Sequence, residues 1–84
     1  MRIVFAERAW EDFTYWVSHD RKTAKRIVRL IDDTKRHPFD GLGKPEPLRN
    51  DLAGFWSRRI TEEHRLVYAV EADQLLIAQA RYHY

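Results

Sequence analysis

The 84-residue sequence has no cysteine, only three glycines and three prolines, and no long apolar run. The absence of cysteine excludes disulfides and thiolate metal sites. The four histidines lack the paired spacing typical of zinc ligands, so we expect neither a metal nor a cofactor. The apolar stretch at the N-terminus is too short for a signal peptide, and no segment reaches the length of a membrane span. We therefore expect a cytoplasmic protein without membrane contact.

Length and charge set further limits. A chain of this size forms one domain, residues 1–84, whose thin core buries about 60–65% of the unfolded surface, so a partner subunit is a natural expectation. Fifteen basic against thirteen acidic residues is too small an excess to indicate nucleic acid by itself. Three tryptophans and four tyrosines suit base stacking, although aromatic rings more often fill cores.

Two helices are predicted in the first half of the chain. Trp10, Phe13 and Val17 recur with helical spacing and predict the buried stripe of the first helix. Asp20 is a good N-cap for a second helix over residues 21–36. The predicted buried side of that helix is Ala24, Ile27, Leu30, Ile31 and Thr34, and its predicted solvated side is Lys25, Arg26, Arg29, Lys35 and Arg36.

The second half of the chain predicts antiparallel hairpins. All three prolines and two of the three glycines gather in residues 37–47, which indicates a stiff loop. The segments after it alternate in polarity and are joined by short polar connections. The fold class is therefore α+β, with two N-terminal helices packed on one face of a twisted antiparallel sheet, in the order β-α-α-β-β-β. The predicted strands are 2–5, 55–61, 65–71 and 75–81, with a further short strand near Leu48 and Arg49.

The register of the first predicted hairpin decides which cations share a face. A three-residue loop would pair Thr61 with Arg65 and place Arg59 on the same face as Arg65. A two-residue loop would put the two arginines on opposite faces.

Two residues suit proton transfer. Glu46 lies between two prolines that restrict its backbone, as the positioning of a general base requires, although a solvated loop glutamate is the alternative. His83 lies one residue from the end, and histidine gives or takes a proton near neutral pH. A near-terminal histidine is often idle, but the aromatic tail predicts packing, with the sheet face of Arg59 one place for it. His64, in the hairpin loop, is predicted to be solvated.

Basic residues crowd the second half of the chain. Gathered in one concavity they would bind RNA backbone and stabilise charge at a reacting phosphorus. The alternative is salt bridging with Glu62, Glu63 and Glu71. RNA carries its own nucleophile, the 2′-hydroxyl, so such a set with one acid and one base requires no metal. The basic residues concerned are Lys44, Arg49, Arg58, Arg59, Arg65 and Arg81.

Three motifs resemble the YoeB toxins of the RelE/ParE superfamily: Lys44-Pro-Glu-Pro-Leu48, residues 54–70, and the terminal Arg-Tyr-His-Tyr. The likeness runs the length of the chain. It implies a microbial-RNase-like fold and cleavage of mRNA in the ribosomal A site, leaving a 2′,3′-cyclic phosphate and a 5′-hydroxyl. It also implies a homodimer and a cognate YefM-like antitoxin, whose C-terminal segment covers the active site.

The resemblance also implies roles for individual residues. Glu46 corresponds to the general base, His83 to the general acid and Arg65 to the residue that stabilises the phosphate. Arg49 stands where the best-known members have lysine, so we assign it to phosphate binding only. Two alternatives remain open, a ParE-like toxin that binds DNA gyrase and a non-catalytic ribosome- or RNA-binding protein. The predicted substrate-binding residues are Arg59, Arg49, Tyr84 and Lys44.

Overall fold

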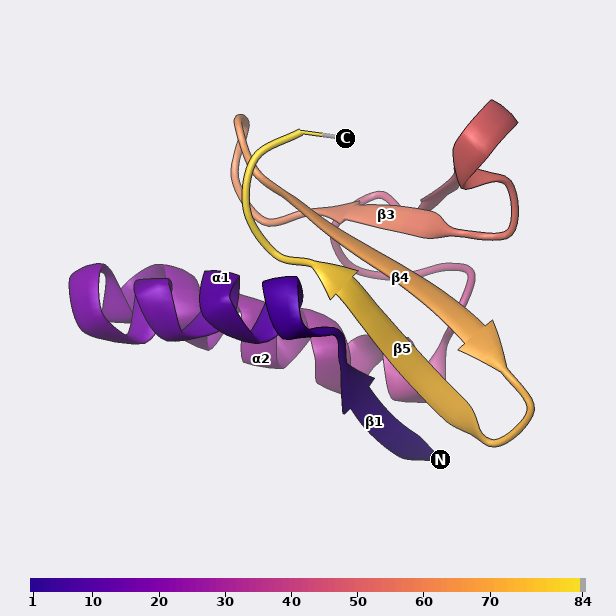
Figure 1. The fold of residues 1–84 in the computed structure, drawn as a ribbon, viewed down its shortest axis with the longest axis horizontal. Coiled ribbons are helices and arrows are strands. Elements are labelled where there is room, and N and C mark those ends of the chain that lie inside the picture. The colour runs from indigo at the N-terminus through magenta and orange to yellow at the C-terminus, as the bar shows by residue number, and fades with distance from the viewer. Residues whose placement is uncertain (84) are drawn as a thin grey trace.

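The computed structural model describes residues 1–83. Figure 1 shows two helices on one side of a five-stranded sheet, which confirms the predicted fold class. None of the helices in residues 1–83 is both long enough and apolar enough to span a membrane. The elements are β1 (Arg2–Phe5), α1 (Glu7–His19), α2 (Arg21–Arg36), β2 (Glu46–Pro47), the 3-10 turn η1 (Asn50–Leu52), β3 (Trp56–Arg59), β4 (Arg65–Glu71) and β5 (Gln74–Gln79).

The sheet is mixed, with strand order β1-β5-β4-β3-β2. The pairs β2–β3, β3–β4 and β4–β5 are antiparallel, as predicted, whereas β1 runs parallel to β5. The long connection through both helices allows this parallel direction, which a short hairpin could not. The extra short strand is β2 at Glu46–Pro47, just before the predicted position at Leu48 and Arg49.

Helix α2 follows its prediction closely. The side chain of Asp20 accepts a hydrogen bond from the backbone N–H of Thr23 at 3.2 Å, which caps the first turn. Arg26 is the exception on the predicted solvated side, because it is half-buried and donates to the backbone carbonyls of Ile60 and Arg59. The residues predicted to be buried are all buried: Ala24, Ile27, Leu30, Ile31 and Thr34.

The predicted stripe of helix α1 is wrong at Trp10 and Val17, whereas Phe13 is half-buried and packs against the core. Trp10 is 54% exposed and Val17 is 42% exposed, and the buried residues are Ala9, Asp12 and Trp16. The sheet covers the side of the helix that carries Ala9 and Trp16, and Trp10 instead packs at its margin. Helical spacing alone fits either side, so the sheet decides which one is buried.

Candidate functional site

The sheet face away from the helices collects the predicted site residues. Glu46 on β2 is paired with Ser57 on β3, and Arg59 is paired directly with Arg65 on β4. Residues in directly paired positions, and residues two apart along a strand, share a face. Glu46, Arg59 and Arg65 therefore lie on one face.

The loop between β3 and β4 spans residues 60–64, so the predicted three-residue loop is wrong. The same-face relation of Arg59 and Arg65 nevertheless holds, because the observed register places them opposite each other. Inside the loop, the Thr61 hydroxyl accepts from the backbone N–H groups of Glu63 and His64, each at 3.2 Å. These local bonds give the wider turn its shape.

The strand order also sets how far apart Glu46 and Arg65 lie across the sheet. Strands β2 and β4 flank β3, so their axes are about 10 Å apart. Side chains of Glu46 and Arg65 extend from those strands on the same face. A group bound over β3 would lie between the two strands that carry them.

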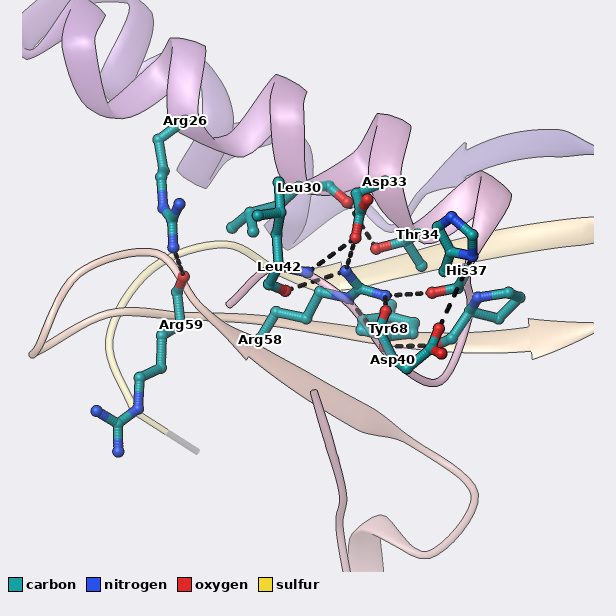
Figure 2. A network of polar contacts seen from close by, with 11 residues as sticks. Arg26, Leu30, Asp33, Thr34, His37, Asp40, Leu42, Arg58, Arg59 and Tyr68 are labelled. Carbon is teal, nitrogen blue, oxygen red and sulfur yellow. Dashed lines mark hydrogen bonds and ion pairs between the residues drawn. The ribbon is translucent and has the colours of Figure 1, made fainter. Parts of the chain in front are cut away.

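The loop that precedes β2 and Glu46 is bound by the side chain of Arg58, which is fully buried (Figure 2). Its guanidinium donates to the Asp33 carboxylate at 2.8 Å and to the Leu42 carbonyl at 3.0 Å. It also donates to the carbonyls of His37 and Asp40. The interpretation of Arg58 as a phosphate-binding residue is therefore wrong.

The alternation of strand β3 explains why Arg58 and Arg59 differ. Successive side chains of a strand point to opposite faces, so Arg58 faces the helices. Its ion-pair partner is Asp33 of α2, rather than the glutamates at positions 62, 63 and 71. The backbone N–H of Leu42 and the Arg58 guanidinium lower the pKa of Asp33 below its ordinary value, which keeps this carboxylate ionised.

Two contacts fix the chain just before Glu46. The backbone N–H of Arg59 donates to the Gly43 carbonyl at 2.7 Å. Gly43 has φ +79°, and a Cβ there would lie 2.9 Å from the Leu30 side chain, so the close approach requires glycine. Because Arg58 also donates to carbonyls of residues 37–42, the loop enters β2 along a defined path.

Arg65 is the most enclosed of the predicted site residues, with 8% of its surface exposed. Its Nη1 donates to the carbonyls of Thr61, Glu62 and His64 at 2.8, 3.0 and 3.1 Å. These bonds pin the guanidinium to the hairpin loop. Within residues 1–83, no protein acceptor is bonded to its Nε or Nη2, so the donors on both nitrogens are not used by those residues.

Helix α1 anchors the start of the C-terminal tail (residues 80–83). The buried Asp12 carboxylate accepts from the backbone N–H of Ala80 at 3.0 Å, and Trp16 Nε1 donates to the Ala80 carbonyl at 2.8 Å. Arg81 follows with its guanidinium 3.5 Å from the ring centre of Tyr15. Arg81 therefore stacks on the helix, and the prediction that it joins the basic concavity is wrong.

The tail then crosses to the β3–β4 hairpin (Figure 1). The backbone N–H of Arg65 donates to the Tyr82 carbonyl at 3.0 Å, and the N–H of Tyr82 donates to His64 Nδ1 at 2.7 Å. His64 is half-buried against the Trp16 ring, so its predicted solvated state is wrong. His83 is the next residue, and its backbone therefore lies beside the start of β4.

The remaining predicted cations are exposed. Figure 2 shows the Arg59 side chain pointing away from the helices, while its carbonyl accepts from Arg26. Lys44 lies two residues before Glu46, and Arg49 is one of residues 47–52, which line a surface groove. Tyr84 lies outside the described residues. Within residues 1–83, no three histidine or acidic side chains are arranged to hold a metal ion.

Sequence reasoning missed the residues that hold the tail, namely Asp12, Trp16, His64 and Gln79. Asp12 and Trp16 are four residues apart and so share a helix face. A charged residue and a tryptophan spaced in this way are a usable signal for a polar anchor inside a core. The pairing of His64 with Tyr82 joins residues 18 apart and has no local signal.

Comparison with known proteins places the chain in a family. Residues 5–84 match the family described as YoeB-like toxin of bacterial type II toxin-antitoxin system. The chain is 60% identical to Toxin YoeB of Escherichia coli (strain K12) over 84 residues, which cover all of both chains.

Solved structures agree. A YoeB/ParE toxin from Agrobacterium tumefaciens is 48% identical, with complete coverage of both chains and a TM-score of 0.98. YoeB of Staphylococcus aureus, solved as a dimer and in a YoeB–YefM complex, is 42% and 41% identical, with TM-scores of 0.94 and 0.92. In both cases the match covers 100% of this chain and 98% of the other. The chain therefore belongs to the YoeB-like toxins of bacterial type II toxin–antitoxin systems.

Proposed function

We propose that this toxin is a ribosome-dependent endoribonuclease that cleaves mRNA in the A site. The observation that carries the proposal is the shared sheet face of Glu46, Arg59 and Arg65. The tail that bears His83 is hydrogen-bonded to the backbone of Arg65 through the Tyr82 carbonyl. A carboxylate and two arginines thus share one face, and the backbone of the tail that bears His83 is bonded beside them.

The proposed reaction is a transesterification within the RNA strand. Glu46 takes the proton from the 2′-hydroxyl, and the resulting oxygen attacks the adjacent phosphorus. The bond between phosphorus and the 5′-oxygen breaks, and His83 gives its proton to that leaving oxygen. The products are a 2′,3′-cyclic phosphate and a 5′-hydroxyl, so the reaction needs no protein nucleophile and no cofactor.

Arginine stabilises the charge that builds up on the phosphorane. Arg65 is held by its Nη1 bonds to the hairpin, and its Nε and Nη2 can donate together to two phosphate oxygens. Arg59, on the paired position, adds a second cation on the same face. Arg49, Lys44 and Tyr84 are proposed to bind the flanking nucleotides.

The ribosome enters the proposal because the site is open. Glu46 and His83 are both exposed, so nothing in residues 1–83 encloses the reacting groups. An mRNA held in the A site would arrive with its backbone already oriented, which supplies the alignment that an open surface lacks. We therefore expect naked mRNA to be a poor substrate.

Two protein partners belong to the proposal. A YefM-like antitoxin is proposed to cover the active-site face, as S. aureus YoeB is known in a complex with YefM. A homodimer is proposed from the dimer of the same relative. Light scattering of the purified toxin across a hundredfold range of concentration, with and without antitoxin, tests both.

Cleavage of a defined mRNA in a reconstituted translation system tests the function. Wild-type toxin should cut at the codon in the A site and leave cyclic phosphate ends. An mRNA with a single 2′-deoxynucleotide at the cut position should resist cleavage there, because the nucleophile is missing. Arrest of translation without cuts would favour the binding-protein alternative, and inhibition of gyrase supercoiling would favour the ParE-like one. Cuts at the deoxynucleotide would contradict the proposed chemistry.

A further inference from the structure

Gln79, the last residue of β5, makes an unusual set of contacts with the tail. Its side-chain Nε2 lies 2.9 Å from the Arg81 carbonyl, 3.3 Å from the Tyr82 carbonyl and 3.1 Å from the His83 carbonyl. An amide nitrogen carries two hydrogens, so these three acceptors share two donors. One side chain thus gathers three successive carbonyls of the tail into a tight turn.

The turn that Gln79 holds is otherwise unfavourable. Tyr82 has φ +66°, in the left-handed region that residues with a Cβ rarely adopt. Such a conformation persists where neighbouring contacts fix it. Gln79 and the backbone N–H of Arg65 both donate to the Tyr82 carbonyl, and His64 accepts the Tyr82 N–H from the other side.

The position of Gln79 on the sheet ties this turn to the site. Gln79 is paired with Val67, two residues beyond Arg65 on β4. The ladder shifts register between Val67 and Tyr68, so the face of Gln79 follows from its pairing with Val67 and is the one that carries Glu46, Arg59 and Arg65. The bond from its amide reaches the carbonyl of His83 itself, the residue proposed to supply the leaving-group proton.

We propose that Gln79 is a positioning residue that sets the direction in which the His83 imidazole leaves the tail. This inference rests on the proposed ribonuclease function. Gln79 touches no reacting atom in it, so it is not a catalytic residue. Its amide fixes the backbone on either side of Tyr82, and that backbone determines where the next side chain points. A terminal segment without such bonds would fray and carry its histidine with it.

The expected effect falls more on turnover than on binding. A displacement of about 1 Å in a reacting group can lower a rate by about 100-fold. Loss of the Gln79 bonds should therefore lower kcat about 10- to 100-fold. Most of the groups proposed to bind RNA are cations outside the tail, so the concentration for half-maximal cleavage should change less than kcat does.

The test compares Gln79→Met with Gln79→Glu and with a matched control. Methionine keeps the length of the side chain but has no donor, and glutamate at neutral pH presents oxygen to three carbonyl oxygens. Gln74→Met is the control, because Gln74 is the glutamine at the opposite end of the same strand. Each variant is assayed for thermal unfolding, for amide hydrogen exchange at residues 82 and 83, and for kcat on ribosome-bound mRNA.

In both Gln79 variants, the tail amides should exchange at least about tenfold faster, while the amides of β4 and β5 stay protected as in wild type. The kcat should fall, with glutamate at least as severe as methionine, and the Gln74 variant should match wild type. Unchanged exchange in the tail, or a loosened tail with unchanged kcat, would overturn the positioning role. If wild-type toxin itself makes no cuts, the ribonuclease proposal fails and this role fails with it. If wild-type toxin cuts and both Gln79 variants behave as it does, the positioning role fails while the ribonuclease proposal stands.

Discussion

Replacing Arg58 by lysine should destabilise the toxin strongly, although the charge is kept. The guanidinium of Arg58 makes five hydrogen bonds, to the Tyr68 hydroxyl, the Asp33 carboxylate and the carbonyls of Leu42, His37 and Asp40. A lysine ammonium carries three donors, so at least two of these acceptors lose their partner.

The magnitude follows from those lost bonds. An enclosed polar group without a partner costs about 1–3 kcal/mol. Because the 37–42 loop lies at the surface, water replaces part of the loss, and we expect about 2–3 kcal/mol in total. A domain of this size has a free energy of unfolding of about 4–13 kcal/mol. The melting temperature should therefore fall by about 10–20 °C.

Urea and thermal unfolding, followed by circular dichroism, measure the effect. The matched control is Arg59→Lys, the same substitution one residue along the same strand, where the side chain is exposed. That control should lie within about 0.5 kcal/mol of wild type. Equal stability of the two variants would refute the assignment of Arg58 as the residue that holds the 37–42 loop.

Two further predictions concern the same loop. The pKa of Asp33 is lowered in the folded state, so the stabilisation it gives is present above its ordinary value of 3.8 and is lost as the pH falls through the folded value. Asp33→Asn should therefore reduce the free energy of unfolding at pH 7 and flatten its decline in acid; a decline as steep as in wild type would contradict this. Gly43→Ala should destabilise by about 1 kcal/mol or more beyond Gly54→Ala, because both glycines have positive φ but only Gly43 would bring a Cβ against other atoms. Urea unfolding of the pair measures the difference, and equal losses would show that contact at Gly43 is unimportant.

Much of the fold could be predicted because its signals are local. Asp20 caps α2 and Pro38 follows its end, so the bounds Arg21–Arg36 were accessible from sequence. Strand alternation also places the neighbouring Arg58 and Arg59 on opposite faces. Alternation does not predict that Arg58 is buried, because nothing in the sequence near Arg58 indicates that Asp33 would enclose it.

The path of the C-terminal tail could not be predicted, because its contacts are long-range. Ala80 is bonded to Asp12 and Trp16, more than sixty residues earlier in the chain. The aromatic composition of the tail predicted packing and no particular partner. The buried side of α1 was missed for a related reason, since the contacts of Trp16 with Ala80 and His64 are also long-range. In the candidate site, only the placement of Arg59 and Arg65 on one face had a basis in strand alternation and register, because Glu46 lay in a predicted loop.

The most direct test of the central claim is primer extension on a defined mRNA in a reconstituted translation system, comparing wild-type toxin with Glu46→Gln and His83→Ala. Glu71→Gln and His37→Ala are the controls, because both side chains are exposed and lie outside the proposed site. If Glu46 and His83 are the base and acid, each site variant should cut about 100- to 10,000-fold more slowly, and both controls should cut as wild type does. Cuts of normal strength from either site variant would contradict the assignment of that residue, and normal cuts from both would contradict the acid–base account.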